Sequence, residues 1–330
     1  MTDDVARRRP LAIGIPQAGD RVGELLSPLS EKEALEELHR EGLEIQARSH
    51  WDLFKRKFLR HKLAVGSLVL LFLIIVSAVF ADLIAPYEFD QIDLANRSLG
   101  PTLEGFHLFG TDKIGRDYFT RVLFGIRTSL QVAFVVGLVS TILGAVVGAI
   151  AGYFGRWVDN LLMRFTDLFL TLPFFAVLLI AAAFLGRGSP IRVSFIVALL
   201  LWPTLARVVR GSFLSLREKE FVEAARASGA SDWRIIFRHM LPNALSPIIV
   251  NLTLTIATAI LLEASLSFLG FGIQPPTPAL GKLIADGKDA LVTQWWLVTF
   301  PGAMIVVISL CINFLGDGLR DALDPFQRAK

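Results

Sequence analysis

The chain has 330 residues, of which 53% are hydrophobic, and its mean hydropathy is +0.56. A soluble domain is about 45–50% apolar, and here the excess is gathered into long runs, which excludes a purely soluble protein. The net charge of +3 does not indicate nucleic-acid binding, because the basic residues lie beside the apolar runs, where the positive-inside rule places them. The single cysteine, Cys311, excludes an internal disulfide.

The N-terminal region contains no apolar run of the length found in a signal peptide, so the first long run is expected to act as an uncleaved start-transfer helix. Residues 1–30 have the composition of a disordered tail. Ser30 and Glu33 form a capping box ahead of a short charged helix. We predict a cytoplasmic tail over residues 1–50, then a first transmembrane helix and an external loop within residues 51–126.

Six apolar runs are long enough to cross a bilayer, since a hydrocarbon core about 30 Å thick needs roughly 20 mostly apolar residues per helix. The basic stretch "FKRKFLRHK" precedes the first run and holds that end in the cytoplasm. Counting crossings then places both termini and the charged insert 210–246 inside. The fold class is therefore an all-α polytopic membrane protein. The expected spans are residues 63–81, 127–151, 161–185, 191–210, 247–270 and 295–316.

Three glycines form a ridge of small residues in the second expected span. Gly144, Gly148 and Gly152 recur at i, i+4 and i+8, a spacing that lets helix backbones approach closely. Two interpretations remain open: packing within the chain's own bundle, or a contact face for a partner subunit.

Motifs that would give the chain its own catalytic chemistry are absent from the sequence. "GTDKIG" has the glycine spacing of a nucleotide-binding loop, but Arg116 and Asp117 follow it in place of Lys and Ser or Thr. There is no H-E-x-x-H motif, no Cys/His cluster and no G-x-S-x-G elbow. We therefore expect no enzymatic activity, no metal site and no cofactor bound by this chain.

Polar residues inside the expected spans are few. Glu263 is the one acid clearly within a span, where a charged acid costs roughly 2.5–3.5 kcal/mol on insertion scales. We expect it to face the bundle interior with a hydrogen-bond partner, a proton relay being the alternative. Asn251 and Asn313 either line a polar translocation path or tie helices together.

The charged insert contains "EFVEAARASGASDWRIIFRHMLPNAL", residues 220–245, which predicts two short helices joined by a sharp bend. The first helix should end at Gly229, and Ser231 or Asp232 can cap the second. Pro242 should end the second helix. An amphipathic helix resting on the membrane surface is the alternative interpretation. The second helix carries an apolar stripe at i, i+3, i+4 and i+7, made of Trp233, Ile236, Phe237 and Met240.

The insert resembles the EAA loop of binding-protein-dependent ABC importer permeases. His239 stands where the general pattern has an aliphatic residue, a departure similar to the dipeptide/oligopeptide/nickel branch. That branch, and its C-type subunit most closely, is also suggested by "FGTDKIGRDYFTRVLFGIRTSL" (109–130), "DLFLTLPFF" (167–175) and "EASLSFLGFGIQPPTPALGKLI" (263–284). The residues that match the EAA pattern are Glu223, Ala224, Ala225, Gly229, Leu241 and Pro242.

The resemblance implies one N-terminal span followed by a five-helix type I ABC importer permease core over residues 127–320, with a cytoplasmic tail at 321–330. The matching residues, with Trp233, Ile236 and Phe237, would dock into a groove of a separate ATPase subunit. The implied partners are two ATPase subunits that hold ATP and Mg, a second permease subunit forming a heterodimer, and an extracytoplasmic substrate-binding protein. All would assemble at the cytoplasmic (inner) membrane.

The cargo implied by the branch is a di- or oligopeptide, with nickel or another small solute as the alternative. A secondary transporter or channel is the rival class, and a membrane enzyme or a structural scaffold is less well supported by the residues. The external segment "GTDKIGRDYFTRVL" either contacts the binding protein or the second permease, or forms a short helix that covers the outer ends of the bundle.

Overall fold

The computed structural model describes residues 50–184 and 188–323. The capping box at Ser30 and most of both expected tails therefore lie outside the described residues. The chain divides into two units, Met1–Leu53 and Phe54–Lys330. Of the first unit only the beginning of one helix is described, so the fold below is that of the second unit.

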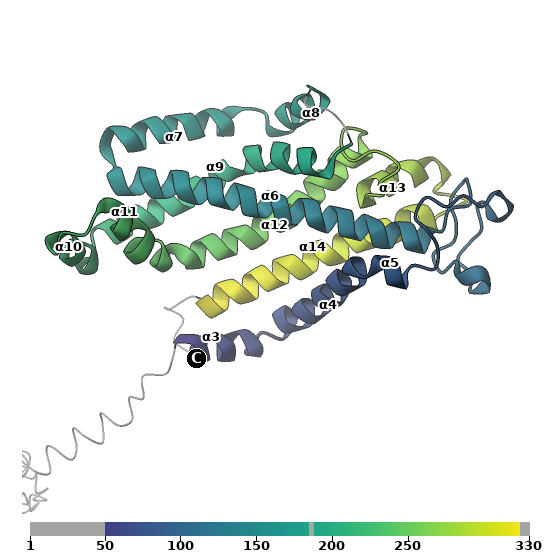
Figure 1. The fold of residues 1–330 in the computed structure, drawn as a ribbon, viewed down its shortest axis with the longest axis horizontal. Coiled ribbons are helices and arrows are strands. Elements are labelled where there is room, and N and C mark those ends of the chain that lie inside the picture. The colour runs from purple at the N-terminus through teal and green to yellow at the C-terminus, as the bar shows by residue number, and fades with distance from the viewer. Residues whose placement is uncertain (1–49, 185–187, 324–330) are drawn as a thin grey trace, which may run out of the picture. The chain divides into compact units, whose positions relative to one another are not determined.

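The second unit is helical, and within the described residues the only β-type pairing is the isolated bridge between Thr111 and Asp117. The long helices α4, α6, α9, α12 and α14 run side by side, and α7 lies along α6 and α9 (Figure 1). The helices are α3 (His50–Arg60), α4 (Lys62–Val79), α5 (Ala81–Ile84), η1 (Leu94–Asn96), η2 (Glu104–Phe106), α6 (Tyr118–Phe154), α7 (Arg156–Thr171), α8 (Phe174–Phe184), α9 (Pro190–Arg217), α10 (Glu220–Ala227), α11 (Asp232–Arg234), η3 (Ile235–Met240), η4 (Pro242–Ala244), α12 (Leu245–Phe268), α13 (Leu280–Gly287), η5 (Lys288–Ala290) and α14 (Trp296–Leu323).

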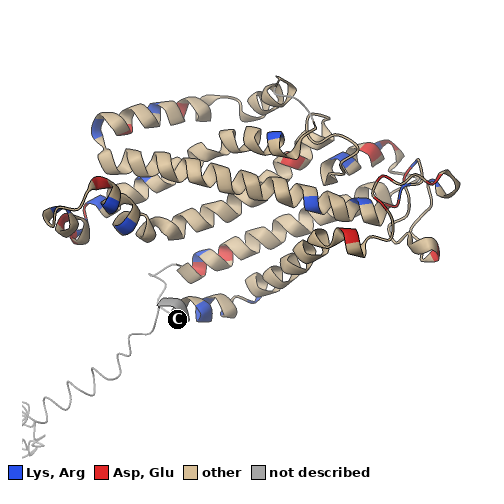
Figure 2. Ribbon diagram, in the orientation of Figure 1, with Lys and Arg blue, Asp and Glu red and all other residues tan. Residues whose placement is uncertain are grey.

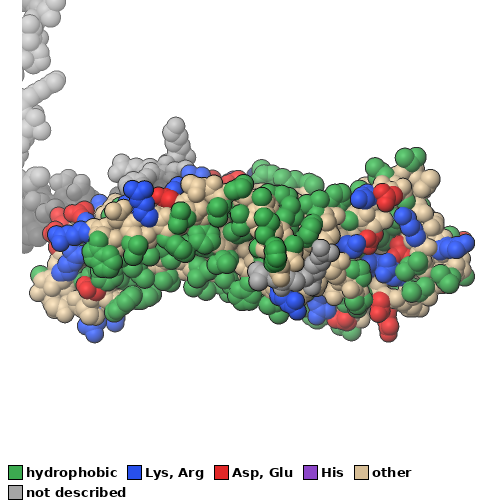
Figure 3. Space-filling model, turned by 90° about the horizontal axis from the view of Figure 1, so that it is seen from above, with side chains coloured by type: hydrophobic (Ala, Val, Ile, Leu, Met, Phe, Trp, Pro, Cys, Tyr) green, Lys and Arg blue, Asp and Glu red, His purple; other side chains and the backbone are tan. Residues whose placement is uncertain are grey.

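Five helical stretches are long and apolar enough to cross a membrane, and the bent pair α7–α8 gives up to six. This confirms the predicted all-α polytopic membrane fold. Charged residues concentrate at the two ends of the bundle, and the middles of α6, α12 and α14 are almost free of them (Figure 2). On the face that carries α7 and α8, hydrophobic side chains cover the middle and charged ones lie toward both ends (Figure 3). A lipid hydrocarbon layer requires this distribution.

The third expected span, residues 161–185, is not one straight helix. The chain breaks between α7 and α8, and the two helices meet at 87°. Leu172 adopts extended backbone angles, and Pro173 follows it. Proline has no backbone N–H and disfavours a helical conformation in the residue before it, which explains the break at this position.

Two other boundaries also differ from the prediction. Helix α6 begins at Tyr118 rather than near residue 127, because the Asp117 side chain caps it by accepting a bond from Thr120 N at 2.8 Å. The external loop is therefore shorter than 82–126. Helix α9 continues past residue 210 to Arg217.

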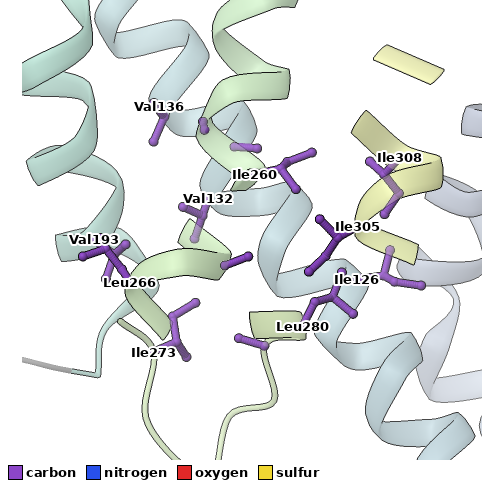
Figure 4. Packing of buried hydrophobic residues seen from close by; sticks show 14 of the residues in the cluster. Ile126, Val132, Val136, Val193, Ile260, Leu266, Ile273, Leu280, Ile305 and Ile308 are labelled. Carbon is purple, nitrogen blue, oxygen red and sulfur yellow. The ribbon is translucent and has the colours of Figure 1, made fainter. Parts of the chain in front are cut away.

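The main hydrophobic core lies where α6, α12, α13 and α14 meet. Figure 4 shows Val132 of α6 near Ile260 of α12, and Ile126 of α6 near Leu280 and Ile305. These side chains are at most 7% exposed. At about 25 cal/mol for each Å² of apolar surface removed from water, a core of this kind is the main source of stability outside the bilayer-facing surface.

The glycine ridge of α6 packs against α9. A Cβ added at Gly144 would lie 2.8 Å from the Leu205 Cβ, and one at Gly152 would lie 2.5 Å from the Phe213 Cβ. At Gly148 it would lie 2.8 Å from the Val209 Cβ and closer still to a backbone carbonyl of α9. The three glycines therefore serve a close helix contact within the chain's own bundle.

Candidate functional site

Residues 218–244, which we call the α10–η4 segment, connect α9 to α12 at one end of the bundle (Figure 1). Helix α10 ends as its sequence predicts. Gly229 has φ +75, its N–H bonds Arg226 O at 2.9 Å, and Ala230 N bonds Ala225 O at 3.1 Å. This pair of bonds is a Schellman motif, which turns the chain sharply after the helix.

The second half of the α10–η4 segment is not a regular α-helix. Residues 235–240 form a π-helix, and Leu241 N bonds Ile236 O at 2.8 Å across its wide turn. Such wide turns are rare and often lie at functional sites. The wider turn moves each following side chain around the helix axis, so the predicted one-sided apolar stripe is wrong.

The four residues of that stripe lie on two faces instead. Ile236 and Met240 are 1% and 0% exposed, whereas Trp233 and Phe237 are 55% and 54% exposed. The two exposed rings stack with centroids 5.9 Å apart. One face therefore anchors the segment, and the other presents an aromatic surface to its surroundings.

The buried face belongs to a second hydrophobic cluster at this end of the bundle. Val222 of α10 and Ile235 of η3 are 0% exposed there. They pack with Val209 and Phe213 of α9. Each fully buried side chain of this kind contributes roughly 1.5–3 kcal/mol, so the α10–η4 segment moves with the helices that hold it.

A polar tie also fixes the segment to the end of α6. The Tyr153 hydroxyl donates to Asp232 Oδ1 at 2.6 Å, and the Arg226 guanidinium lies 5.4 Å from the centre of the Tyr153 ring. Sequence reasoning did not identify Tyr153 or Arg226. The sequence gives only a slight indication of this tie: a tyrosine in "GYF" at the end of the glycine ridge, and a basic residue within the EAA stretch.

The predicted docking residues divide between the two faces. Glu223, Ala224, Gly229 and Pro242 are exposed and form the outer surface together with Trp233 and Phe237. Ala225 and Leu241 are half-buried and pack against the second cluster. The outer surface thus combines one acid, small residues and two stacked rings on a rigid support.

Glu263 lies at 0% exposure in the interior between α6 and α12. The Ser129 hydroxyl donates to its Oε2 at 2.7 Å, and the Ser267 hydroxyl donates to its Oε1 at 2.7 Å. Ser267 in turn accepts from Ile273 N at 3.1 Å. This chain of bonds links two helices and the loop after α12, as a structural role requires.

The two asparagines selected from the sequence are half-buried on α12 and α14. The Asn251 side chain donates to Pro247 O, one turn earlier in its own helix, at 3.1 Å. Asn313 lies on α14, close in sequence to the buried Cys311 and Ile312. The structure does not bring either asparagine together with Glu263 in a single site.

At the opposite end of the bundle, the segment before α6 is tightly bonded to the helix ends. The Tyr118 hydroxyl donates to Leu297 O at 2.6 Å, and Trp296 Nε1 donates to Thr111 O at 3.2 Å. Asp112 bonds both Arg116 and Arg121, at 2.7 and 2.8 Å. The segment therefore lies over the ends of α6, α13 and α14. It is not a separate short helix, because its residues from Tyr118 onward are the beginning of α6.

The turn at position 115 of this segment requires a glycine. Gly115 has φ +83, and a Cβ there would collide with the backbone of Asp93. Asp93 accepts bonds from Asn96 Nδ2 at 2.8 Å and Ala95 N at 3.0 Å. These bonds, chiefly the one from Asn96, hold the pKa of the Asp93 carboxyl below its usual value.

Within residues 50–184 and 188–323, no group of three or more His, Cys, Asp or Glu side chains is placed to hold a metal ion.

Comparisons with known proteins agree on the family. The model of the N-terminal transmembrane domain of oligopeptide transport permease C matches residues 49–101. The dipeptide transport system permease protein DppC of Alkalihalophilus pseudofirmus is 43% identical over 281 residues, covering 85% of this chain and 91% of that protein. The oligopeptide transport system permease protein OppC of Haemophilus influenzae is 41% identical over 290 residues, covering 87% of this chain and 92% of that protein.

A solved chain of the MetNI methionine ABC transporter, in an inward-facing conformation, covers 62% of this chain and 97% of its own length at 22% identity, with a TM-score of 0.48. The model of the binding-protein-dependent transport system inner membrane component matches residues 144–329, more than half of the chain. On this match and the two curated relatives, the chain belongs to the family of binding-protein-dependent transport system inner membrane components.

Proposed function

We propose that this chain is a permease subunit of an ATP-driven peptide importer and that the α10–η4 segment docks onto a separate ATPase subunit. The observation that carries the proposal is the outer surface of that segment. Glu223, Ala224, Trp233 and Phe237 are exposed on a support that buries its other face in the bundle. A surface of this kind transmits force, because a push on it moves α9 and α12.

The peptide cargo is supported by the names of the relatives, which are a dipeptide and an oligopeptide permease. Nickel or another small solute remains the alternative cargo. The rival class, a secondary transporter driven by protons, would need a buried acid free to act as a proton relay. The buried acid of α12, Glu263, is held by two serine hydroxyls inside the bundle instead.

In the proposed assembly, two ATPase subunits hold ATP and Mg, and a second permease subunit completes the membrane part as a heterodimer. A substrate-binding protein delivers the peptide from the outside. The complex lies in the inner membrane with both termini of this chain in the cytoplasm, an orientation supported by the basic residues beside α4 and in the α10–η4 segment. Nucleotide is hydrolysed on the partners, so this chain has no enzymatic activity of its own.

Docking is tested at Ala224, because its side chain is exposed and faces away from the second cluster. Ala225 is a poorer choice, since it packs on that cluster and a large residue there would disturb the bundle itself. We expect Ala224→Trp to reduce co-purification with the ATPase subunits, and ATP-driven uptake, by roughly tenfold or more, equivalent to about 1.4 kcal/mol.

The control is Ala224→Ser, which keeps the residue small and should behave as the wild type. Both variants should insert in the membrane and pair with the second permease equally well. The measurement is peptide uptake by proteoliposomes that contain the whole importer, with ATP or with a proton gradient. Normal uptake by the tryptophan variant would refute the docking surface, and uptake driven by the proton gradient alone would refute the ATP-driven class.

A further inference from the structure

The exposed surface of helix α7 is divided lengthwise into a polar half and an apolar half. The apolar half consists of Trp157, Leu161, Phe165 and Leu168, which are 51–73% exposed. The polar residues recur at i, i+4, i+8, i+11 and i+15, a spacing that places them on one side of a helix. They are Arg156, Asn160, Arg164, Asp167 and Thr171.

Helix α9 continues this polar surface. Its exposed residues Thr204, Arg207, Gly211 and Ser215 recur at i, i+3, i+7 and i+11. Arg207 Nη2 bonds Asp167 Oδ1 at 2.6 Å, which joins the two surfaces although both side chains are about half exposed. We call this surface the polar lane; it consists of Asn160, Arg164, Asp167 and Thr171 of α7 with Thr204, Arg207, Gly211 and Ser215 of α9.

The polar lane runs along two helices that belong to candidate membrane spans. Arg207 belongs to the candidate span Pro190–Arg217, and it lies about 15 Å along the helix axis from Arg217. Helix α7 runs beside α6 and α9, which are both candidate spans, so α7 does not lie flat on the membrane surface (Figure 1). Figure 2 shows charges of both signs along α7, unlike the middle of α12 or α14.

Lipid covers such a surface poorly. Charged residues within transmembrane segments normally face a water-filled cavity or a polar partner. The apolar half of α7 suits lipid or an apolar neighbour. Helix α7 therefore lies at a boundary, with a hydrophobic medium on one side and a polar medium on the other.

The charge of the lane is unbalanced. Arg164 pairs with no acid among the described residues, and Asp167 is paired with Arg207. The nearest other acid of α7, Asp159, is bonded by Arg210 on the far side of the lane, with Nη2 to Oδ2 at 2.6 Å. The lane thus offers one unneutralised guanidinium group, that of Arg164, and a guanidinium binds a carboxylate through paired N–H donors.

We propose that the polar lane forms one wall of the cytoplasm-facing half of the translocation path, where Arg164 binds the carboxylate of a peptide in transit. The proposal rests on the proposed function for its cargo, because a peptide with a free C-terminus carries such a carboxylate. Asp167 and Arg207, paired with each other, position the surface beside it without adding net charge.

The position of the lane is tested with single cysteines in the assembled importer on a Cys311→Ala background that retains uptake. We expect Asn160→Cys and Ser215→Cys to react with a membrane-impermeant thiol reagent added from the cytoplasmic side. The matched controls, Leu161→Cys and Leu168→Cys, lie on the apolar half of the same helix and should remain unlabelled. Labelling of both sets alike would overturn the proposal.

The same experiment separates a water-filled path from a subunit contact. If the lane cysteines react in the isolated chain but not in the assembled importer in any nucleotide state, the lane is a protein interface and the path proposal fails. That result would leave the proposed function untouched, because it concerns only the location of the path.

The role of Arg164 is tested with two peptides that differ only in a C-terminal carboxylate or carboxamide. Binding of each peptide to the substrate-binding protein is measured first, so that uptake is compared at equal occupancy. We expect Arg164→Gln to lower uptake of the carboxylate peptide by about tenfold, the scale of one lost charged hydrogen bond, and to leave the carboxamide peptide unchanged. Arg164→Lys should recover part of the loss.

An equal effect on both peptides, or on neither, would overturn the assigned role of Arg164. If the wild-type importer takes up neither peptide with ATP, the proposed peptide function fails instead. The labelling result would stand in that case, so the two failures are distinguishable.

Discussion

Among single residues, Glu263 shows how a costly group is accommodated inside the membrane. Its two carboxyl oxygens accept bonds from Ser129 and Ser267, and the side chain is fully buried. Burial of an unbonded polar group costs about 1–3 kcal/mol in proteins. The two serines remove most of that cost and fix α6 against α12, so Glu263 is placed to hold helices together.

A pair of substitutions at Glu263 separates this structural role from a proton relay. Glu263→Gln keeps an acceptor and a shape that both serines can bond, so we expect uptake within about twofold of the wild type, a change of roughly 0.4 kcal/mol. Glu263→Leu removes both acceptors and leaves two buried hydroxyls with no acceptor for their protons, so its Tm in detergent should fall. Loss of uptake in the glutamine variant with an unchanged Tm would instead indicate a relay.

At the scale of elements, the contact between α6 and α9 depends on the absence of side chains. Gly148 faces the backbone of α9 so closely that an added methyl group must push the helices apart. We expect Gly148→Ala to destabilise the protein by about 1–3 kcal/mol, as overpacking does. The change is measurable as a lower Tm of the purified chain.

Gly66 of α4 is the matched control for this prediction. It is also a glycine within a membrane helix, but a Cβ added there meets nothing within 4 Å. Gly66→Ala should therefore be neutral or should stabilise by up to about 1 kcal/mol, the helix propensity difference. Equal loss of stability in both alanine variants would show that close approach is not the reason for the ridge.

Sequence patterns predicted the elements whose cause is local. Runs of apolar residues predicted the location of the spans, and Gly229 predicted the end of α10. The bend between α7 and α8 is harder to predict from the sequence, because the residues on both sides of Pro173 form one continuous apolar run. Only the geometry shows that the proline separates two helices.

Two features of the candidate sites had no readable local signal. The π-helix at 235–240 places Trp233 and Phe237 opposite Ile236 and Met240, whereas the ordinary helical period puts all four together. The polar half of α7 was divided in the prediction, because Arg156 and Asn160 were assigned to a loop and Arg164 to a span. These three residues lie on one face only because a single helix, α7, contains them all.

For the whole molecule, the α10–η4 segment and the covering segment before α6 lie at opposite ends of the helix bundle (Figure 1). The charge distribution predicts that the end with the α10–η4 segment faces the cytoplasm, because that segment is rich in arginine and the other end has balanced charges. The proposed docking to a cytoplasmic ATPase and the proposed delivery of substrate from the outside both require this orientation.

The orientation is tested with two exposed positions on the Cys311→Ala background. Ser231 lies in the α10–η4 segment, and Val292 is 96% exposed at the opposite end, after η5. In sealed cells we expect an impermeant thiol reagent to label Val292→Cys, and to label Ser231→Cys only after the membrane is opened. The reverse pattern would invert the topology and refute docking at the α10–η4 segment.

The stacked Trp233 and Phe237 rings also have a consequence for the biogenesis of this chain. Each is more than half exposed on a rigid surface outside the lipid-facing part of the molecule. If this surface docks onto an ATPase subunit as proposed, a chain synthesised without that partner leaves the aromatic patch exposed to chaperones and proteases. Balanced co-expression of the two genes should therefore raise the yield of intact protein, and an excess of this chain alone should be degraded.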